Sequence, residues 1–259
     1  MDWDASTYSG TFGDGWTDSV GGVFAQQGGG DGPVKSVATI AGASVDVIEF
    51  SADSFDVFWT TAENPGAPPF EGLSEYSISI VFSTTSAGAG SEDNWYQWNG
   101  LVGVENPGPG VGDWTLGLSE NGFAGGGGSL GGGDVGTLTT APLAAGYHTM
   151  TFVLEDNGDA THSQYLYLDG VLQTSDLNIA YGGATVIDSQ GRFAIGARFA
   201  GDNGFIDANI ARIQFDDTAL SQGEIDLLHA DYLGEVPEPG AAACLALSGL
   251  ALLARRRRG

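Results

Sequence analysis

Apolar and polar residues alternate along much of the chain. In Tyr76–Ser83 the aromatic and isoleucine side chains fall on one face and the serines on the other, and Tyr147–Leu154 also alternates. A period of two residues is typical of a β-strand with one buried face. The same pattern and short apolar runs predict six further strands: Val45–Phe50, Phe55–Thr60, Trp114–Leu118, Tyr165–Leu168, Phe193–Ile195 and Ile210–Phe215. A chain with this many short strands is expected to form antiparallel sheets.

Glycine-containing segments lie between the predicted strands. Asp169-Gly170 separates two apolar runs and predicts a type I′ hairpin turn, in which both central residues need a positive φ. The glycine tracts Gly125–Gly128 and Gly131–Gly133 predict a loop, or strand edges whose register is poorly defined.

One helix is expected near the end of the domain. Ser221 and Glu224 have the spacing of a capping box, in which each residue bonds the backbone of the other. Apolar residues then follow at helical spacing: Ile225, Leu228 and Tyr232. The body of the chain is therefore predicted to be a β-domain that ends in one short helix.

Composition narrows the class of protein. The 259 residues include 33 acidic and 8 basic side chains, with a net charge of -25, which argues against nucleic-acid binding because phosphates require clustered Lys and Arg. Such a surface would instead attract cations. Charged residues make up only 16%, against about 25% in ordinary domains, which favours β structure. Cys244 is the only cysteine, so no intramolecular disulfide and no cysteine zinc cluster is possible.

The last 24 residues have a different character from the rest. Pro237, Glu238 and Pro239 precede the uncharged stretch Gly240–Ala254, and four basic residues follow: Arg255, Arg256, Arg257 and Arg258. A helix over the uncharged stretch would be about 22 Å long, shorter than the roughly 30 Å hydrocarbon core, although arginine stems and bilayer thinning cover part of the gap. The pattern predicts a short membrane helix with its arginines on the cytoplasmic side.

This tail resembles the bacterial PEP-CTERM sorting signal in order and position. The resemblance implies export to the cell surface or extracellular matrix, with an exosortase as the partner that removes the tail from a membrane-tethered precursor. We therefore expect a domain over 1–235 and a sorting segment over 236–259. Family members also carry a signal peptide. Met1–Asp4 opens directly into polar sequence, so we expect the signal upstream of Met1.

The body also resembles a known family. Tyr147–Phe152, Leu166–Val171, Phe193–Gly196 and Phe205–Ile213 resemble core motifs of laminin-G-like domains, and Ala219–Ile225 resembles their closing motif. The resemblance implies a two-sheet antiparallel β-sandwich of the concanavalin-A-like jelly-roll type, followed by the short helix and the separate tail helix. Tyr147 and the Asp207-Ala208 pair depart from the usual family residues.

Catalytic motifs are incomplete. Glu224-Ile225-Asp226 begins like the motif of laminarinase-type glycosidases, but His229 stands where a second carboxylate is needed, and the segment has a helical pattern. The G-x-S-x-G match at 127–131 falls inside a glycine tract and lacks the strand-turn-helix context of a nucleophile elbow. His148 is expected to pack in a strand and His162 to lie in a loop. We predict that the protein is not an enzyme; a glycan-cleaving enzyme of this fold is the alternative.

Two loop segments offer hard oxygen ligands for Ca²⁺. These donors are Asp156, Asn157 and Asp159 in one loop and Asp202 and Asn203 in another. Asn-Gly and Asp-Gly pairs are also ordinary turn formers, so a pair of plain turns is the alternative.

Aromatic residues gather around a Gly/Pro-rich loop: Trp95, Tyr96, Trp98 and Trp114. Aromatic rings stack on sugars and are enriched at binding surfaces, so these four are the candidate ligand-binding residues. The alternative is that the tryptophans pack in the core. We expect a non-enzymatic exported protein that binds extracellular polysaccharide or a surface protein, with a purely structural matrix component as a further alternative.

Overall fold

The computed structural model describes residues 2–11, 14–18, 23–27, 32–59, 73–84, 87–104, 113–129, 134–180, 193–198 and 204–233. The predicted sorting segment over 236–259, with its PEP motif, apolar helix and arginines, lies outside these residues. Within the described part of the chain, no helix has both the length and the apolar character needed to cross a membrane.

In the described part of the chain the strands form two sheets of eight, and the strand pairs there are antiparallel. The first sheet runs β14-β13-β12-β7-β16-β5-β4, and β1 also pairs with β16. Its strands are β1 (Asp2–Asp4), β4 (Val34–Ile40), β5 (Ala43–Phe50), β7 (Tyr76–Thr84), β12 (His148–Asp156), β13 (Thr161–Leu168), β14 (Val171–Ala180) and β16 (Ala208–Asp216).

The second sheet runs β11-β10-β9-β8-β15-β6-β3-β2. Its strands are β2 (Trp16–Thr17), β3 (Val23–Gln27), β6 (Val57–Trp59), β8 (Asn99–Val104), β9 (Asp113–Leu118), β10 (Ala124–Ser129), β11 (Asp134–Leu138) and β15 (Phe193–Ile195). The described residues also include three short helices: η1 (Ala5–Thr7), η2 (Trp95–Gln97) and α1 (Gln222–Leu233).

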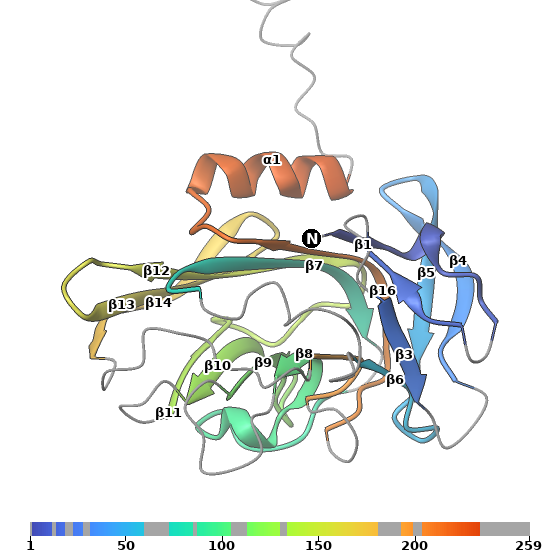
Figure 1. Cartoon of the computed structure of the whole chain (residues 1–259), viewed down its shortest axis with the longest axis horizontal. Coiled ribbons are helices and arrows are strands. Elements are labelled where there is room, and N and C mark those ends of the chain that lie inside the picture. Colours follow the sequence, from blue (N-terminus) through green and yellow to red (C-terminus); the bar gives the residue numbers. More distant parts are fainter. Residues whose placement is uncertain are drawn as a thin grey trace, which may run out of the picture.

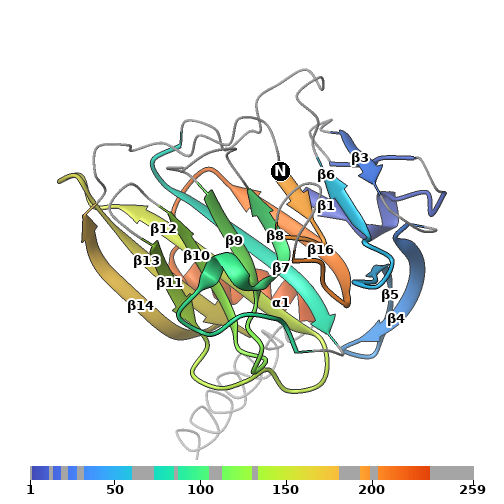
Figure 2. The same cartoon turned by 90° about the horizontal axis from the view of Figure 1, so that it is seen from below.

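The two sheets pack face to face around one main core (Figures 1 and 2). The apolar face predicted for β7 lies in this core together with Met150 and Phe152 of β12 and Leu116 of β9. The predicted two-sheet antiparallel sandwich is therefore confirmed, as are all eight predicted strands. Their observed limits differ from the expected ones by a few residues at some ends.

The opposite face of the first sheet is covered by α1 (Figure 1). Val153 of β12 and Tyr167 of β13 pack there against Ile225 of the helix. The Ser77 hydroxyl is buried beneath this layer, where it donates to the Thr218 carbonyl and accepts from the Leu220 amide, both at 2.9 Å. Strand β7 is thus buried on both faces, because the helix and the segment that leads into it cover its serine face.

The start of α1 follows half of the predicted capping box. The Glu224 carboxylate accepts from the Ser221 amide at 2.8 Å, as expected. The Ser221 hydroxyl donates to the same carboxylate at 2.6 Å instead of accepting from the Glu224 amide, which bonds the Ser221 carbonyl. These bonds lower the pKa of Glu224.

The hairpin between β13 and β14 has the predicted turn. Asp169 and Gly170 have φ values of 53° and 75°, as a type I′ turn requires. The Asp169 carboxylate also accepts from the Thr149 amide at 2.9 Å, so the turn is tied to β12.

The first glycine tract is a strand, which corrects the expected loop and the expected poorly defined register, whereas Gly131–Gly133 lie outside the described residues. Residues 124–129 form β10, which pairs with both β9 and β11 in a defined register. A Cβ at Gly126 would overlap Phe152, and one at Gly125 would lie 2.9 Å from the Trp98 ring. The glycines let large side chains pack directly on the strand, and neighbouring strands on both sides fix its register.

Candidate functional site

The predicted aromatic binding group is mostly buried. Trp95, Trp98 and Trp114 are 3%, 0% and 2% exposed, whereas Tyr96 is 41% exposed. A ring whose faces are packed has none to offer a sugar, so the expectation is corrected for the three tryptophans. Of the four residues, Tyr96 alone presents an accessible ring.

Packing explains this burial. The Trp98 ring contacts the glycine strand β10, and its indole nitrogen donates to the Ser91 carbonyl at 3.0 Å. Trp114 lies 5.9 Å from Tyr76 and 6.1 Å from Phe193, measured between ring centroids inside the main core. Residues 95–98, here called the η2 segment, are therefore packed on the second sheet.

The first predicted calcium loop is a self-bonded turn between β12 and β13. Asp156 accepts from the Gly158 amide at 2.8 Å, which lowers its pKa. Asp159 accepts from the amide and hydroxyl of Thr161, and Asn157 donates to the same hydroxyl at 2.9 Å. Each of the three predicted ligands is thus engaged in a local bond.

Asp202 and Asn203 of the second calcium loop lie outside the described residues. Among the residues that are described, no group of three or more His, Cys, Asp or Glu side chains is arranged to hold a metal ion. Calcium binding remains a prediction.

The segments that raised the question of catalysis lie on a helix and in a paired strand of this fold. Glu224 and Asp226 lie on α1, on the outer face of the first sheet, and Glu224 caps that helix. Ser129 is the last residue of β10, within a paired strand. His162 lies in β13 and is buried, which corrects the expected loop position.

His148 is packed in β12 as expected, and it carries the clearest electrostatic feature of this region. Its Nδ1 lies 2.7 Å from an Asp169 carboxylate oxygen and its Nε2 lies 3.0 Å from the Ala144 carbonyl oxygen. Both partners are acceptors, so only the cationic ring donates to both. The hydrogen bond with Asp169 raises the pKa of His148 despite partial burial. Burial opposes ionisation of Asp169, but the bonds from His148 and Thr149 outweigh it and lower the pKa of that carboxyl.

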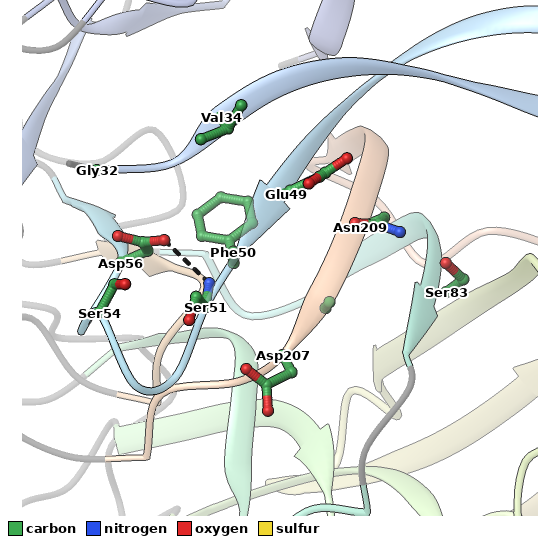
Figure 3. A pocket seen from close by; sticks show the side chains of 11 residues that line it. Gly32, Val34, Glu49, Phe50, Ser51, Ser54, Asp56, Ser83, Asp207 and Asn209 are labelled. Carbon is green, nitrogen blue, oxygen red and sulfur yellow. Dashed lines mark hydrogen bonds between the residues drawn. The ribbon is translucent and has the colours of Figure 1, made fainter. Parts of the chain in front are cut away.

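A pocket of about 370 Å³ opens at one end of the first sheet, and we call it the polar pocket (Figure 3). Its wall comes from the ends of β4, β5, β7 and β16 and from the turn between β5 and β6. The lining residues are Gly32, Val34, Glu49, Phe50, Ser51, Ser54, Asp56, Ser83, Asp207, Ala208 and Asn209. Hydroxyl, amide and carboxylate groups dominate this set, and no Lys, Arg or His is among these described lining residues.

The floor of the polar pocket is a row of four residues that are paired across neighbouring strands. We call it the polar row, after three of its four members. Val34 pairs with Glu49, Glu49 with Asn209, and Asn209 with Ser83. Directly paired residues lie on the same face of a sheet, so these side chains point to the same side, as Figure 3 shows. Register therefore brings together four residues from the β4-β5 hairpin, β7 and β16, which are three separate segments of the chain.

Two aspartates hold the wall of the pocket in place. Asp56 accepts from the Ser51 amide at 3.0 Å, and Asp207 accepts from the Ala52 amide at 2.8 Å. The Thr84 hydroxyl donates to the Asp207 carbonyl at 2.7 Å. The turn after β5 and the start of β16 are thus joined, and the pocket is preformed.

A second pocket of about 590 Å³, here called the loop pocket, lies beside the end of β7. Its described lining contains no charged side chain: Ser83, Thr84, Ala87, Leu118, Asn121, Gly122, Pro142, Leu143, Ala144, Ala145, Gly146 and Tyr147. The wall from 142 to 147 is fixed by the bond from the Leu143 amide to the Gly122 carbonyl and by the His148 bond to Ala144. His148 therefore supports this pocket through its bond to Ala144.

The polar pocket was missed by sequence reasoning. Its residues come from separate segments, and no local motif joins them. A weak signal was present, because Glu49 is the polar position beside two apolar ones in the predicted strand Val45–Phe50. That alternation predicts a face but says nothing about which strands lie next to it.

Comparisons with known proteins give the fold. No protein-family model matches the chain, and no curated protein matches it. Among solved structures, the CBM40 domain of the Ruminococcus gnavus IT-sialidase bound to α2,3-sialyllactose is similar, with 18% identity, a TM-score of 0.50, and coverage of 66% of this chain and 90% of that one.

Toxin binding domains cover more of the chain. The receptor binding domain of botulinum neurotoxin D has 12% identity and a TM-score of 0.57, and the match covers 89% of this chain and 52% of that one. The binding domain of botulinum neurotoxin DC, in complex with rat synaptotagmin II, has 13% identity and a TM-score of 0.56, with coverage of 90% and 51%. This chain thus spans about half the length of those toxin chains. At such identities the likeness establishes the fold: a β-sandwich of two antiparallel sheets with one short helix.

Proposed function

We propose that this protein is a non-enzymatic glycan-binding protein and that the polar pocket is its binding site. The observation that carries the proposal is a preformed pocket in a β-sandwich whose hydroxyl, amide and carboxylate groups come from β5, the turn after it, β7 and the start of β16. Sugar hydroxyls donate readily to such acceptors, and a few well-placed polar groups in a concave site are typical of ligand recognition.

The structural neighbours support binding as the function class. The CBM40 domain of the sialidase is bound to α2,3-sialyllactose, and the neurotoxin D domain is named as a receptor binding domain. The neurotoxin DC complex also supports the alternative that the partner is a surface protein.

A glycan-cleaving enzyme is the second candidate, and the position of Glu224 counts against it. Retaining glycosidases need two carboxyl groups about 5–5.5 Å apart across the scissile bond. Here Glu224 caps a helix on the outer face of the sheet and lacks such a partner in the motif.

The proposal also includes export of the protein and removal of its tail. The PEP motif, uncharged stretch and terminal arginines support a membrane-tethered precursor that an exosortase cleaves, with the mature domain at the cell surface or in the matrix. Fractionation of the full chain and of a chain lacking Pro237–Gly259 tests this. We expect membrane association only with the tail; a full chain that is freely soluble without detergent would contradict it.

A glycan array followed by calorimetric titration tests the binding function. We expect the protein to bind at least one glycan and Asn209→Ala to weaken that binding, because Asn209 lies at the centre of the polar row. Val37→Ala is the matched control, since Val37 is exposed on β4 of the same sheet and does not line the pocket. Binding that is unchanged in Asn209→Ala would move the site elsewhere.

A further inference from the structure

We propose that the polar pocket and the loop pocket are adjacent subsites for one uncharged glycan chain, which crosses the end of β7 at Ser83. This inference rests on the proposed function and names its ligand: a chain of at least two sugar units without acidic groups.

The shared wall joins the two pockets. Ser83 lines both, and no other residue of either described lining does. Ser83 is the last residue of the polar row, and Tyr147, which precedes β12, lies beyond it on the loop-pocket side. The two pockets are therefore neighbours across a single strand.

The dimensions suit a chain better than a single ring. The polar row crosses four strands, so it extends over three strand spacings, or about 14 Å, before the loop pocket begins. A ligand that occupies both pockets must run across the strands. One sugar unit in either pocket would leave the other unused.

The charges select against acidic sugars. Glu49, Asp56 and Asp207 line the polar pocket, and the described lining of the loop pocket is uncharged. The nearest cation in sequence to this row is Lys35, which is engaged with two backbone carbonyls and Asp46. Carboxylates accept hydroxyl donors but repel another carboxylate, so a sialylated ligand is disfavoured.

The two subsites offer different chemistry. The polar pocket supplies acceptors for hydroxyl groups, whereas the accessible side chains of Pro142 and Leu143 give the loop pocket an apolar surface for the CH face of a sugar ring. A chain with alternating polar edges and apolar faces fits this combination. Binding at the second subsite adds to the first without a second association cost, so affinity should rise with chain length.

The test uses the full chain and neutral glucose, mannose and galactose oligosaccharides, from mono- to hexasaccharide. We expect affinity to rise at least about tenfold from the shortest bound sugar to the one that fills both subsites. Ala145→Phe narrows the loop pocket at an exposed position and should remove this rise while preserving the affinity of the short sugar. Val37→Phe is the matched control and should behave as the wild type.

The outcomes separate the two proposals. Equal affinity for short and long sugars would overturn the two-subsite inference and leave glycan binding intact. Tighter binding of α2,3-sialyllactose than of lactose would overturn the uncharged ligand. Failure to bind any glycan would overturn the proposed function together with the inference. The wild-type length series needs no variant, so the inference can fail even where Ala145→Phe does not fold.

Discussion

The η2 segment and the polar pocket make opposite use of residues that suggest binding. The η2 segment concentrates aromatic rings within a short stretch of sequence, yet Trp95 and Trp98 are buried against the second sheet. The polar pocket has no conspicuous local motif, but register collects its groups from distant strands. A group of aromatic residues that are close in sequence can therefore be either a buried packing element or a binding surface. In this fold, the candidate binding surface is recognised from the pairing of strands.

The largest expected loss of stability comes from removing the packing of the η2 segment on the second sheet. Trp98→Ala removes a fully buried ring and should lower the free energy of unfolding by about 3–5 kcal/mol. Tyr96→Ala, two residues away but exposed, should change it by less than about 0.5 kcal/mol. Urea denaturation of both variants checks this. Similar small losses in both would show that the tryptophan is not part of the core.

A smaller loss of stability is expected from a substitution in β10, the strand on which Trp98 packs. Gly126→Ala adds a methyl group that overlaps Phe152, and overpacking of this kind costs about 1–3 kcal/mol. Gly223→Ala is the matched substitution in α1, where nothing lies within 4 Å of the added carbon. It should stabilise the protein by up to about 1 kcal/mol, because alanine favours a helix. Equal effects of the two substitutions on the melting temperature would contradict the packing described for β10.

The smallest expected effect on stability comes from the pair of His148 and Asp169, which holds part of the wall of the loop pocket. The raised pKa of His148 means that its contribution is fully present below the unfolded pKa, near 6.5, and is lost as pH rises through the higher folded value. The lowered pKa of Asp169 means that its contribution is present above its unfolded value and is lost as pH falls through the lower folded value. The pair should thus stabilise the fold most at mildly acidic pH.

Denaturation from about pH 5 to about pH 9 measures this dependence. Asp169→Asn keeps a residue that tolerates the positive φ of the turn but removes the charge. We expect the decline in stability above neutral pH to be shallower in this variant than in the wild type. Identical pH profiles would show that the pair does not contribute.

Much of the fold could be predicted because its signals are local. Alternation located the main strands, Asp169-Gly170 set a hairpin turn, and Ser221 with Glu224 marked the helix start. The glycine tract could not be assigned, because a strand without side chains shows no alternation. Its identity depends on Phe152 and Trp98, which reach it from other parts of the chain.

The candidate site could not be predicted for a related reason. Glu49, Asn209 and Ser83 are ordinary polar positions in their own strands, and only the order β5-β16-β7 makes them neighbours. Sequence spacing contains no information on that order. The aromatic group was noticed because its members are close in sequence, but burial is decided by what packs on them.

The central claim is that glycan binding belongs to the polar pocket and not to the aromatic segment. The most direct measurement is calorimetric titration of the best array glycan into Glu49→Gln, Asn209→Ala and Tyr96→Ala, with folding of each variant verified first. The account predicts a loss of at least about tenfold in affinity for Glu49→Gln and Asn209→Ala and wild-type affinity for Tyr96→Ala. Loss of binding in Tyr96→Ala with wild-type affinity in both pocket variants would contradict it.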